Sequence, residues 1–341
     1  RTVVASLRIL QTIGSGEVFD AWGEILSMVL PQIQRDDVVQ LIVPATKERA
    51  TSDKVESRRL AARIIGSLVD QLHANEIEEQ FLEICMKLME DPDGSVRAMM
   101  AQSLAQVGAA LPLPINETKF WPSLNNMLRN DKEARARAAA LRALSRSAEG
   151  HKDSASSAKS FTEMIVPIFL AECETASKVA ASDLRTIDDD IYLMLEIFAE
   201  VYGYFIVAVA NSLTQDEHWT LALNCLRRMV TCNGPTVRQW CAYNLPALVL
   251  TTAHRRPDRV KGVLHALSTD SDVETRGTLA NGIHEVVAVL CDNEMLRKET
   301  VSALSALITD QNNQVRLNTM QNFALDMENL SKNHPPGEAS R

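Results

Sequence analysis

The sequence has 341 residues and a formal net charge of −9, with 46% apolar residues but only 5% aromatic ones. Its length would allow two globular domains, but 13 glycines and 12 prolines are few for a protein of strands and turns. Lysine and arginine nowhere form a run of five or more. Nucleic acid and anionic membranes are therefore not expected as primary partners, because neutralising phosphates requires clustered positive charge.

Apolar residues at helical spacing predict helices along the whole chain, most of them in pairs. A helix over 1–13 has the pattern of the second half of a truncated pair, and a further helix is expected over 18–33. The pairs that follow are 36–49 with 54–72, 76–90 with 95–109, 116–129 with 133–148, 161–175 with 187–210, 215–231 with 236–252, 256–268 with 273–291, and 294–308 with 312–331.

The pairs are expected to form one continuous solenoid with three parts and a tail. Residues 1–149 hold N-terminal repeats, 150–190 an irregular repeat with a serine-rich loop, 191–331 C-terminal repeats, and 332–341 a disordered tail. The most apolar stretch, 191–210, contains two glutamates four residues apart, which favours a buried amphipathic helix over a membrane span. A sequence that starts with arginine rather than methionine can be a piece of a longer protein.

One short motif recurs in the turns between paired helices. An aspartate lies six residues before an arginine that opens an apolar helix, and weaker copies carry Arg58 and Arg238. These arginines stand at 58, 97, 137, 238, 276 and 316, which are 38 to 40 residues apart except for one interval of 101. A period near 40 with two helices per unit is typical of HEAT and armadillo repeats. The sequence therefore predicts an all-α HEAT-repeat superhelix of about seven to eight repeats.

The residue types in this motif suit the turn between two helices. Aspartate, serine or asparagine can cap the second helix of a pair and complement its dipole. The arginine one turn later can pair with an aspartate of its own or of the neighbouring repeat, which would give a ladder along the stack. The predicted ladder comprises Asp91, Arg97, Asp131, Arg137, Arg238, Asp270, Arg276, Asp310 and Arg316.

Segments 237–249, 274–290 and 310–318 resemble a family more closely than the repeat pattern requires, above all in Cys241-Ala-Tyr-Asn-Leu-Pro246. They are similar to the HEAT-repeat regulatory and scaffold subunits of protein phosphatases 4 and 2A. The insertion at 150–160 and the helix at 187–210 depart from that pattern. The resemblance implies a non-catalytic subunit whose within-repeat turns hold a phosphatase catalytic subunit. The turn positions expected to contact this partner are Lys54, Asp93, Lys132, Gly234, Asp272, Gln311 and Asn312.

The sequence contains no catalytic motif at the spacing that a known chemistry needs. His284-Glu285 is not followed by a second histidine, since Ala288 stands in its place, so a zinc-protease site is not expected. The six cysteines lack paired spacing and are interpreted as buried free thiols of a reducing compartment. We therefore predict no enzyme activity, no cofactor and no metal.

Two other protein-binding functions remain open at this stage. A karyopherin-like carrier would use acidic charge to hold basic cargo, and a tubulin-binding HEAT protein would present exposed residues along its turns. Trp240 is interpreted either as a core residue between repeats or as an exposed contact. A cytoplasmic location is expected, with the nucleus as the alternative.

Overall fold

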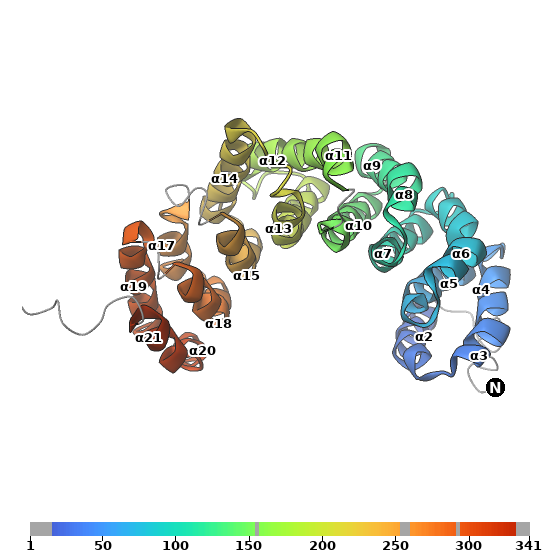
Figure 1. Cartoon of the computed structure of the whole chain (residues 1–341), viewed down its shortest axis with the longest axis horizontal. Helices are drawn as coiled ribbons and strands as arrows, with labels where there is room; N and C mark the ends of the chain where they lie inside the picture. The colour runs from blue at the N-terminus through green and yellow to red at the C-terminus, as the bar shows by residue number, and fades with distance from the viewer. Residues whose placement is uncertain (1–15, 154–156, 253–259, 291–293, 332–341) are drawn as a thin grey trace, which may run out of the picture. The chain divides into compact units, whose positions relative to one another are not determined.

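The computed structural model describes residues 16–153, 157–252, 260–290 and 294–331 (Figure 1). These residues form helices and turns and contain no strand, and the helices follow one another in antiparallel pairs. The predicted all-α class of helical repeats is confirmed. The expected helix 1–13 and the expected tail 332–341 lie outside the described residues.

The chain divides into two compact units, residues 1–160 and 161–341. The division falls inside the stretch that the sequence marks as irregular. The helices of unit 1 are α2 (Gly16–Val29), α3 (Arg35–Asp37), α4 (Val43–Ala50), α5 (Val55–Ser67), α6 (Ala74–Met89), α7 (Gly94–Ala110), α8 (Leu113–Ile115), α9 (Trp121–Asn130), α10 (Ala134–His151) and α11 (Ser157–Ser160).

Unit 2 contains four further pairs. Its helices are α12 (Val166–Ala180), α13 (Asp189–Val209), α14 (Asp216–Thr231), α15 (Pro235–Thr252), α17 (Val263–Ser268), α18 (Val273–Leu290), α19 (Glu294–Ile308), α20 (Asn313–Met320) and α21 (Phe323–Ser331). Two of them differ from expectation. Helix α17 starts only after Gly262, whose positive φ of 88° breaks the helical path. The helix expected over 312–331 is interrupted at Gln321–Asn322 and forms α20 and α21.

Each unit is built of two rows of helices (Figure 1). In unit 1 the first helices of the pairs (α4, α6, α9) form one row, and the second helices (α5, α7, α10) form the other. In unit 2 the first-helix row is α12, α14, α17 and α19, and the second-helix row is α13, α15, α18 and α20. Successive second helices pack directly on one another, α5 on α7 on α10 and α13 on α15 on α18. The apolar core lies between the two rows.

A proline near the start of three first helices changes the hydrogen bonding of the turn before it. Pro44, Pro122 and Pro167 are each preceded by a π-helical turn, at 38–42, 116–120 and 161–165. Proline has no N–H and its ring crowds the preceding turn. A π-helical turn widens the helix there and accommodates it, so the first helix continues through the proline.

The long apolar helix α13 carries the centre of the unit 2 core. Phe169 of α12 packs against Phe198, Tyr202 and Phe205 of α13, with ring centroids 5.8–6.3 Å apart. The buried Tyr202 hydroxyl donates to the carbonyl of Ala222 at 2.8 Å. By length and composition α13 is the one described helix that could cross a membrane. In the structure its apolar side chains instead pack against α12 and α15.

Candidate protein-binding site

The recurring turn is organised by its aspartate. The carboxylate of Asp91 accepts the N–H of Asp93, and Asp131 does the same for Glu133, at 2.9 Å in both turns. Asp270 and Asp310 accept the N–H groups of the residues two positions on, at 2.8 Å. Each aspartate thereby fixes the bend of the chain between the two helices of a pair.

The second oxygen and the remaining lone pairs of each aspartate accept from an arginine of the preceding repeat. These bidentate pairs are 2.6–3.1 Å long in all four repeats where the structure shows them. They join Arg58 to Asp91, Arg97 to Asp131, Arg238 to Asp270, and Arg276 to Asp310. The same arginine donates from Nη1 to the carbonyl six residues earlier in its own turn, at 2.7–2.9 Å. One guanidinium therefore ties two consecutive turns together.

Electrostatics reinforce this ladder. The hydrogen bond to Asp91 raises the pKa of Arg58, and the one to Asp131 raises the pKa of Arg97. The hydrogen bond from Arg276 holds the pKa of Asp310 below its usual value. For Asp131, burial favours the neutral acid, but the bonds from Arg97 and from the N–H of Glu133 outweigh burial and lower its pKa. Both partners are therefore charged at neutral pH.

Arg137 and Arg316 make the same contacts within their own turns as the other ladder arginines. The Nη1 of Arg137 donates to the carbonyls of Asp131 and Lys132, and the Nη1 of Arg316 donates to those of Asp310 and Gln311. Between the first two repeats of unit 2 an amide of the following turn makes the link. Asn233, between α14 and α15, donates to the carboxylate of Asp183, between α12 and α13, at 2.7 Å and accepts the N–H of Leu184 at 3.1 Å.

The predicted partner contacts fall into three kinds. Asp93, Asp272 and Asn312 are helix caps, because their side-chain oxygens accept backbone N–H groups two or three residues on, at 2.8–2.9 Å. Gly234 is buried, and a Cβ there would meet Leu184 and Tyr192. The exposed side chains of the set are Lys54, Lys132 and Gln311.

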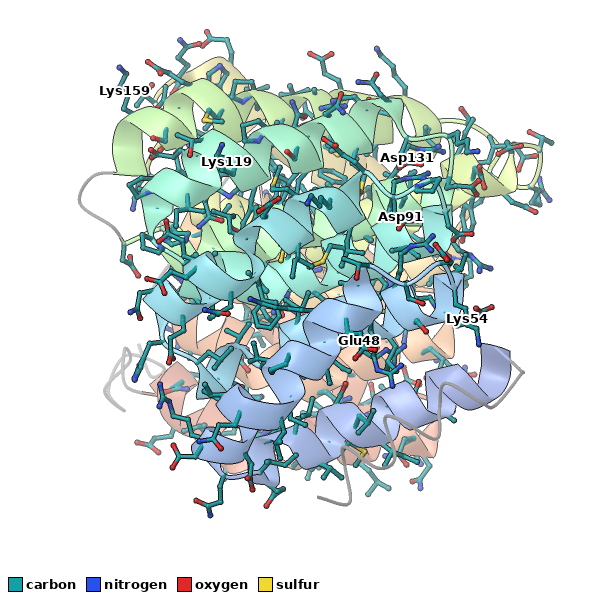
Figure 2. The ribbon with its side chains drawn as sticks, turned by 90° about the vertical axis from the view of Figure 1, so that its right-hand side faces the viewer. Glu48, Lys54, Asp91, Lys119, Asp131 and Lys159 are labelled. Atoms are coloured by element: carbon teal, nitrogen blue, oxygen red, sulfur yellow. The ribbon has the colours of Figure 1, made fainter. Side chains whose placement is uncertain are left out.

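The turns of unit 1 line up along one edge. Figure 2 shows Lys54, Asp91 and Asp131 on that edge, whereas Lys119 and Lys159 lie on the opposite edge. We call the first edge the turn ridge and define it as residues 51–54, 90–93 and 131–133. Because the ladder pairs of Arg58 and Arg97 run along it, its exposed side chains stand at a fixed spacing. A partner can therefore contact several turns at once.

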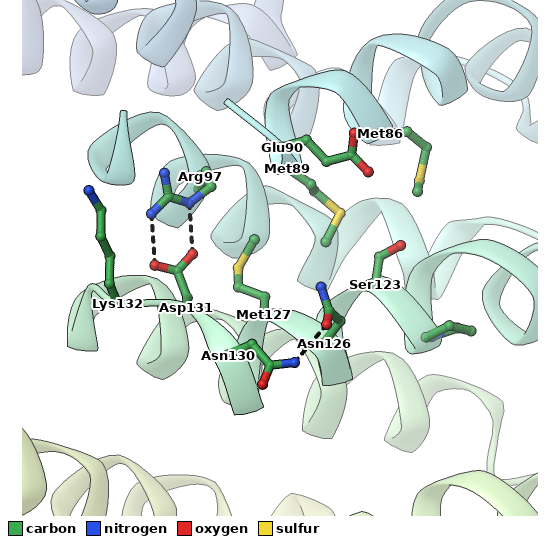
Figure 3. Close-up of a pocket in the computed structure, with 11 residues that line it drawn as sticks. Met86, Met89, Glu90, Arg97, Ser123, Asn126, Met127, Asn130, Asp131 and Lys132 are labelled. Carbon is green, nitrogen blue, oxygen red and sulfur yellow. Dashed lines mark hydrogen bonds and ion pairs between the residues drawn. The ribbon is translucent and has the colours of Figure 1, made fainter. Parts of the chain in front are cut away.

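A groove of about 620 Å³ opens beside the ridge, between α6 and α9 (Figure 3). Its apolar wall comes from Met86, Met89 and Met127, and Lys132 and the Arg97–Asp131 pair lie at its ridge end. Asn130 donates to Asn126 at 2.8 Å on the α9 side, which leaves polar groups at the rim. Methionine side chains adapt to varied apolar shapes, and this volume is in the range of sites that hold a small ligand or a few side chains.

The sequence predicted Lys132, at the ridge end of this groove, as a partner contact. It did not predict the methionine wall. Met86 and Met127 have the helical spacing of core residues, and only their placement on neighbouring first helices brings them together. A signal was present, since residues 86–127 contain five of the 12 methionines of the chain.

Among the described residues, no group of three or more His, Cys, Asp or Glu side chains is placed so that it could hold a metal ion. Cys85, Cys173, Cys225, Cys232 and Cys241 are buried free thiols, whereas Cys291 lies outside the described residues. Burial raises the pKa of Cys85 to about 12. A thiol held in its neutral form is a poor nucleophile.

Comparison with known proteins identifies the repeat and one set of relatives. Residues 43–145 match the family of HEAT repeats. The chain is 22% identical over 324 residues, 85% of its length, to human serine/threonine-protein phosphatase 4 regulatory subunit 4, and 22% identical over 312 residues to the mouse protein. The expected resemblance to phosphatase 4 regulatory subunits is confirmed. The chain spans about a third of the length of these relatives, 35% and 34%.

Solved structures with a similar fold include importin beta and a Kap95:Nup1 complex. Importin beta in a polyethylene glycol condition superposes with a TM-score of 0.66 at 13% identity, covering 86% of this chain and 37% of the other. The Kap95:Nup1 complex gives a TM-score of 0.67 at 15% identity, covering 87% and 36%. At this identity the likeness shows the HEAT-type fold alone.

Proposed function

We propose that this chain is a non-catalytic regulatory or scaffold segment that holds the catalytic subunit of a serine/threonine phosphatase of the phosphatase 4 or 2A type. The observation that carries the proposal is the similarity to a phosphatase 4 regulatory subunit along 85% of the chain. This similarity extends over most of the repeats of the chain.

The turn ridge of unit 1 and the adjoining groove are the surface proposed for this partner. Because the ladder of ion pairs fixes the ridge, its backbone would lose little conformational entropy when a partner binds. The groove accepts an apolar anchor among its methionines, and Lys54 and Lys132 offer positive charge on the ridge. A buried apolar anchor surrounded by a polar rim is the usual arrangement of a protein interface.

The test is capture of purified phosphatase 4 and phosphatase 2A catalytic subunits by the immobilised chain. A ridge variant, Lys54→Glu with Lys132→Glu, and a groove-filling variant, Ser123→Trp, are each expected to weaken capture about tenfold or more. Lys119→Glu with Lys159→Glu makes the same charge change on the opposite edge of unit 1 (Figure 2) and should leave capture intact. Failure of the unchanged chain to capture either subunit in low salt contradicts the proposal.

The two alternative protein-binding functions have direct tests of their own. A karyopherin-like carrier would bind a Ran-type GTPase, and a tubulin-binding protein would co-sediment with microtubules. The proposal expects neither result. It also expects no phosphatase activity from the chain alone.

A cytoplasmic location is part of the proposal, with the nucleus as the alternative. Five buried free thiols support a reducing compartment. Imaging the tagged full-length protein in cells tests it, and accumulation in a secretory compartment would contradict it.

A further inference from the structure

The second-helix row of unit 2 carries an aromatic and aliphatic stripe in which Tyr243 and Leu250 are exposed and Trp240 and Ala247 are half-buried. Trp240, Tyr243, Ala247 and Leu250 of α15 follow one another at spacings of three and four residues and so lie on one helical face. Tyr243 is 56% and Leu250 64% exposed, although both are large apolar side chains. The core of α15 uses a different stripe, which includes the buried Val237, Cys241, Leu245 and Leu248.

This face is held rigidly. The rings of Trp240 and Tyr243 stack edge to face with centroids 5.6 Å apart. The amide of Asn244, on the α13 side of the helix, donates to the carbonyls of Ala199 and Glu200 at 2.8 and 3.0 Å. Towards α18, Gln239 donates to the hydroxyl of Thr278 at 3.3 Å. The stripe therefore lies between two neighbouring helices of fixed register.

Carboxylates flank the stripe on both sides. On α13, the hydroxyl of Tyr192 lies close to Glu196 of the same helix and to Thr236 at the start of α15, which places Glu196 beside the start of the stripe. On the other side α18 exposes Glu274 and Glu285. Because Thr278 faces Gln239, these two glutamates lie one and two helical turns from that contact on the exposed face of α18.

Positive side chains are scarce on the three helices. Their lysines and arginines are Arg238 and Arg276 alone, and both are engaged with Asp270 and Asp310 in the ladder. The one other basic group is His284, next to Glu285. In unit 1 the second helices do carry basic side chains, such as the exposed Arg135 and Arg146 of α10 and the half-buried Arg59 of α5 and Arg142 of α10. The acidic character thus belongs to this face of unit 2 and is not a general property of second helices.

From the aromatic stripe and its two acidic flanks we infer that the exposed face of α13, α15 and α18 binds an extended, arginine- or lysine-rich segment of a partner protein. A guanidinium stacks on the faces of tryptophan and tyrosine, while neighbouring basic residues reach the carboxylates of α13 and α18. Packed helices lie about 8–10 Å apart, so three helices span about 20 Å. An extended chain covers this distance with about six or seven residues.

The surface lies in unit 2, whereas the phosphatase contact proposed above lies in unit 1. The two assignments can therefore fail independently. Substitutions on the ridge should leave binding of a basic segment unchanged, and substitutions on α15 should leave capture of a phosphatase catalytic subunit unchanged.

The probe is a fluorescein-labelled ten-residue peptide with four arginines separated by glycine and serine, measured by fluorescence anisotropy with the whole chain in low salt. Tyr243→Ala is expected to weaken binding about tenfold or more, as is Glu196→Gln with Glu285→Gln. Binding should fall steeply as salt rises. Glu174→Gln removes one carboxylate from the exposed side of α12 in the first-helix row and is expected to bind like the unchanged chain. A peptide with glutamate in place of arginine should not bind.

Three results would overturn the inference. One is absence of peptide binding by the unchanged chain in low salt. Another is equal binding by the unchanged chain, the Tyr243→Ala variant and the glutamine variant. The third is a concentration-dependent dimer that Tyr243→Ala abolishes, because the stripe would then be covered by a second copy of the chain. Circular dichroism of each variant establishes that a loss of binding is not a loss of folding.

Discussion

Removing the guanidinium of Arg276 tests how much the ladder stabilises the stack. Arg276 donates to the carboxylate of Asp310 at 2.6 and 3.1 Å and to the carbonyl of Asp270 in its own turn at 2.7 Å. Arg316 stands at the same position one repeat later and donates to the carbonyl of Asp310 at 2.6 Å. In the described part of the chain Arg316 has no ion pair with another repeat. Comparing Arg276→Met with Arg316→Met therefore isolates the bond between repeats.

The structure sets the expected size of the difference. A neutral hydrogen bond contributes about 0.5–1.5 kcal/mol, so loss of the bonds within the turn should cost about 1 kcal/mol in Arg316→Met. Arg276→Met also leaves the Asp310 side chain, which is 6% exposed, with the N–H of Asn312 as its remaining donor. Breaking a fully buried ion pair costs about 3–5 kcal/mol. Because the Arg276 side chain is 17% exposed, we expect a lower total of about 3 kcal/mol.

Urea unfolding followed by circular dichroism measures the free energy of unfolding. Hydrogen exchange in α18 and α20 assigns the loss to this interface, since the two units of the chain need not unfold together. A double-mutant cycle with Asp310→Asn should give a coupling energy of about 1–2 kcal/mol. Equal destabilisation by Arg276→Met and Arg316→Met, or a coupling below about 0.5 kcal/mol, would refute the role of the ladder.

The ion pair of Arg276 and Asp310 also makes the free energy of unfolding depend on pH. The folded-state pKa of Asp310 lies below its usual value because of Arg276. The stabilisation of the fold by this carboxylate is therefore fully present above the pKa of an unfolded aspartate, about 3.9. It is lost as the pH falls through the lower pKa of the folded state. Arg276→Met should remove part of this acid-induced loss.

The remaining predictions concern two residues of unit 2: Gly203, which packs closely against Asn244 of a neighbouring helix, and Asp326, whose carboxyl group is buried. A Cβ on Gly203 would lie 2.9 Å from Cγ of Asn244, so Gly203→Ala should destabilise by about 1–3 kcal/mol through overpacking. Gly277→Ala, whose nearest neighbours would be 4.0 Å away, should instead stabilise α18 by about 0.5–1 kcal/mol; thermal unfolding of both variants checks the contrast. The carboxylate of Asp326 is buried without a hydrogen-bond partner among the described residues, and burial raises its pKa to about 6. Since that is above the unfolded value, ionisation weakens the fold, and stability should fall as the pH rises from about 4 to about 6. Asp326→Asn should raise stability at pH 7 by about 2 kcal/mol and remove this dependence, as urea unfolding across the pH range would show.

The fold could be predicted from the sequence because the aspartate–arginine motif of the turns recurs at a regular spacing. An aspartate six residues before an arginine is a local pattern, and its recurrence near every 40 residues identified both the repeat length and the position of each turn. Helix ends were less accurate where tertiary contacts decide them. Asn322, where α20 gives way to α21, lies 3.3 Å from the His284 ring of α18, and no local pattern shows this contact.

The binding surfaces were harder to predict because they are made of residues that look like core. Met86 and Met127 have core spacing on separate helices, and only the stacking of α6 on α9 turns them into one groove wall. The stripe of Trp240, Tyr243 and Leu250 could have been predicted from the sequence. One helix with two apolar stripes has more apolar surface than its neighbours can cover, and the second stripe is then exposed.

The geometry of the turns also decides which ridge variants can report on a partner. Asp93 accepts the N–H and the hydroxyl of Ser95 at 2.9 and 2.6 Å, and these bonds lower its pKa. Asp93→Ala should therefore cost about 1 kcal/mol of stability, so a loss of partner binding in that variant would mix unfolding of α7 with loss of contact. Lys132→Ala touches no cap and should change stability by less than about 0.5 kcal/mol. If Lys132→Ala weakens capture of a phosphatase catalytic subunit at unchanged thermal stability, the ridge itself makes the contact. If only Asp93→Ala does so, the turns act through the helices that they cap, and the contact lies elsewhere.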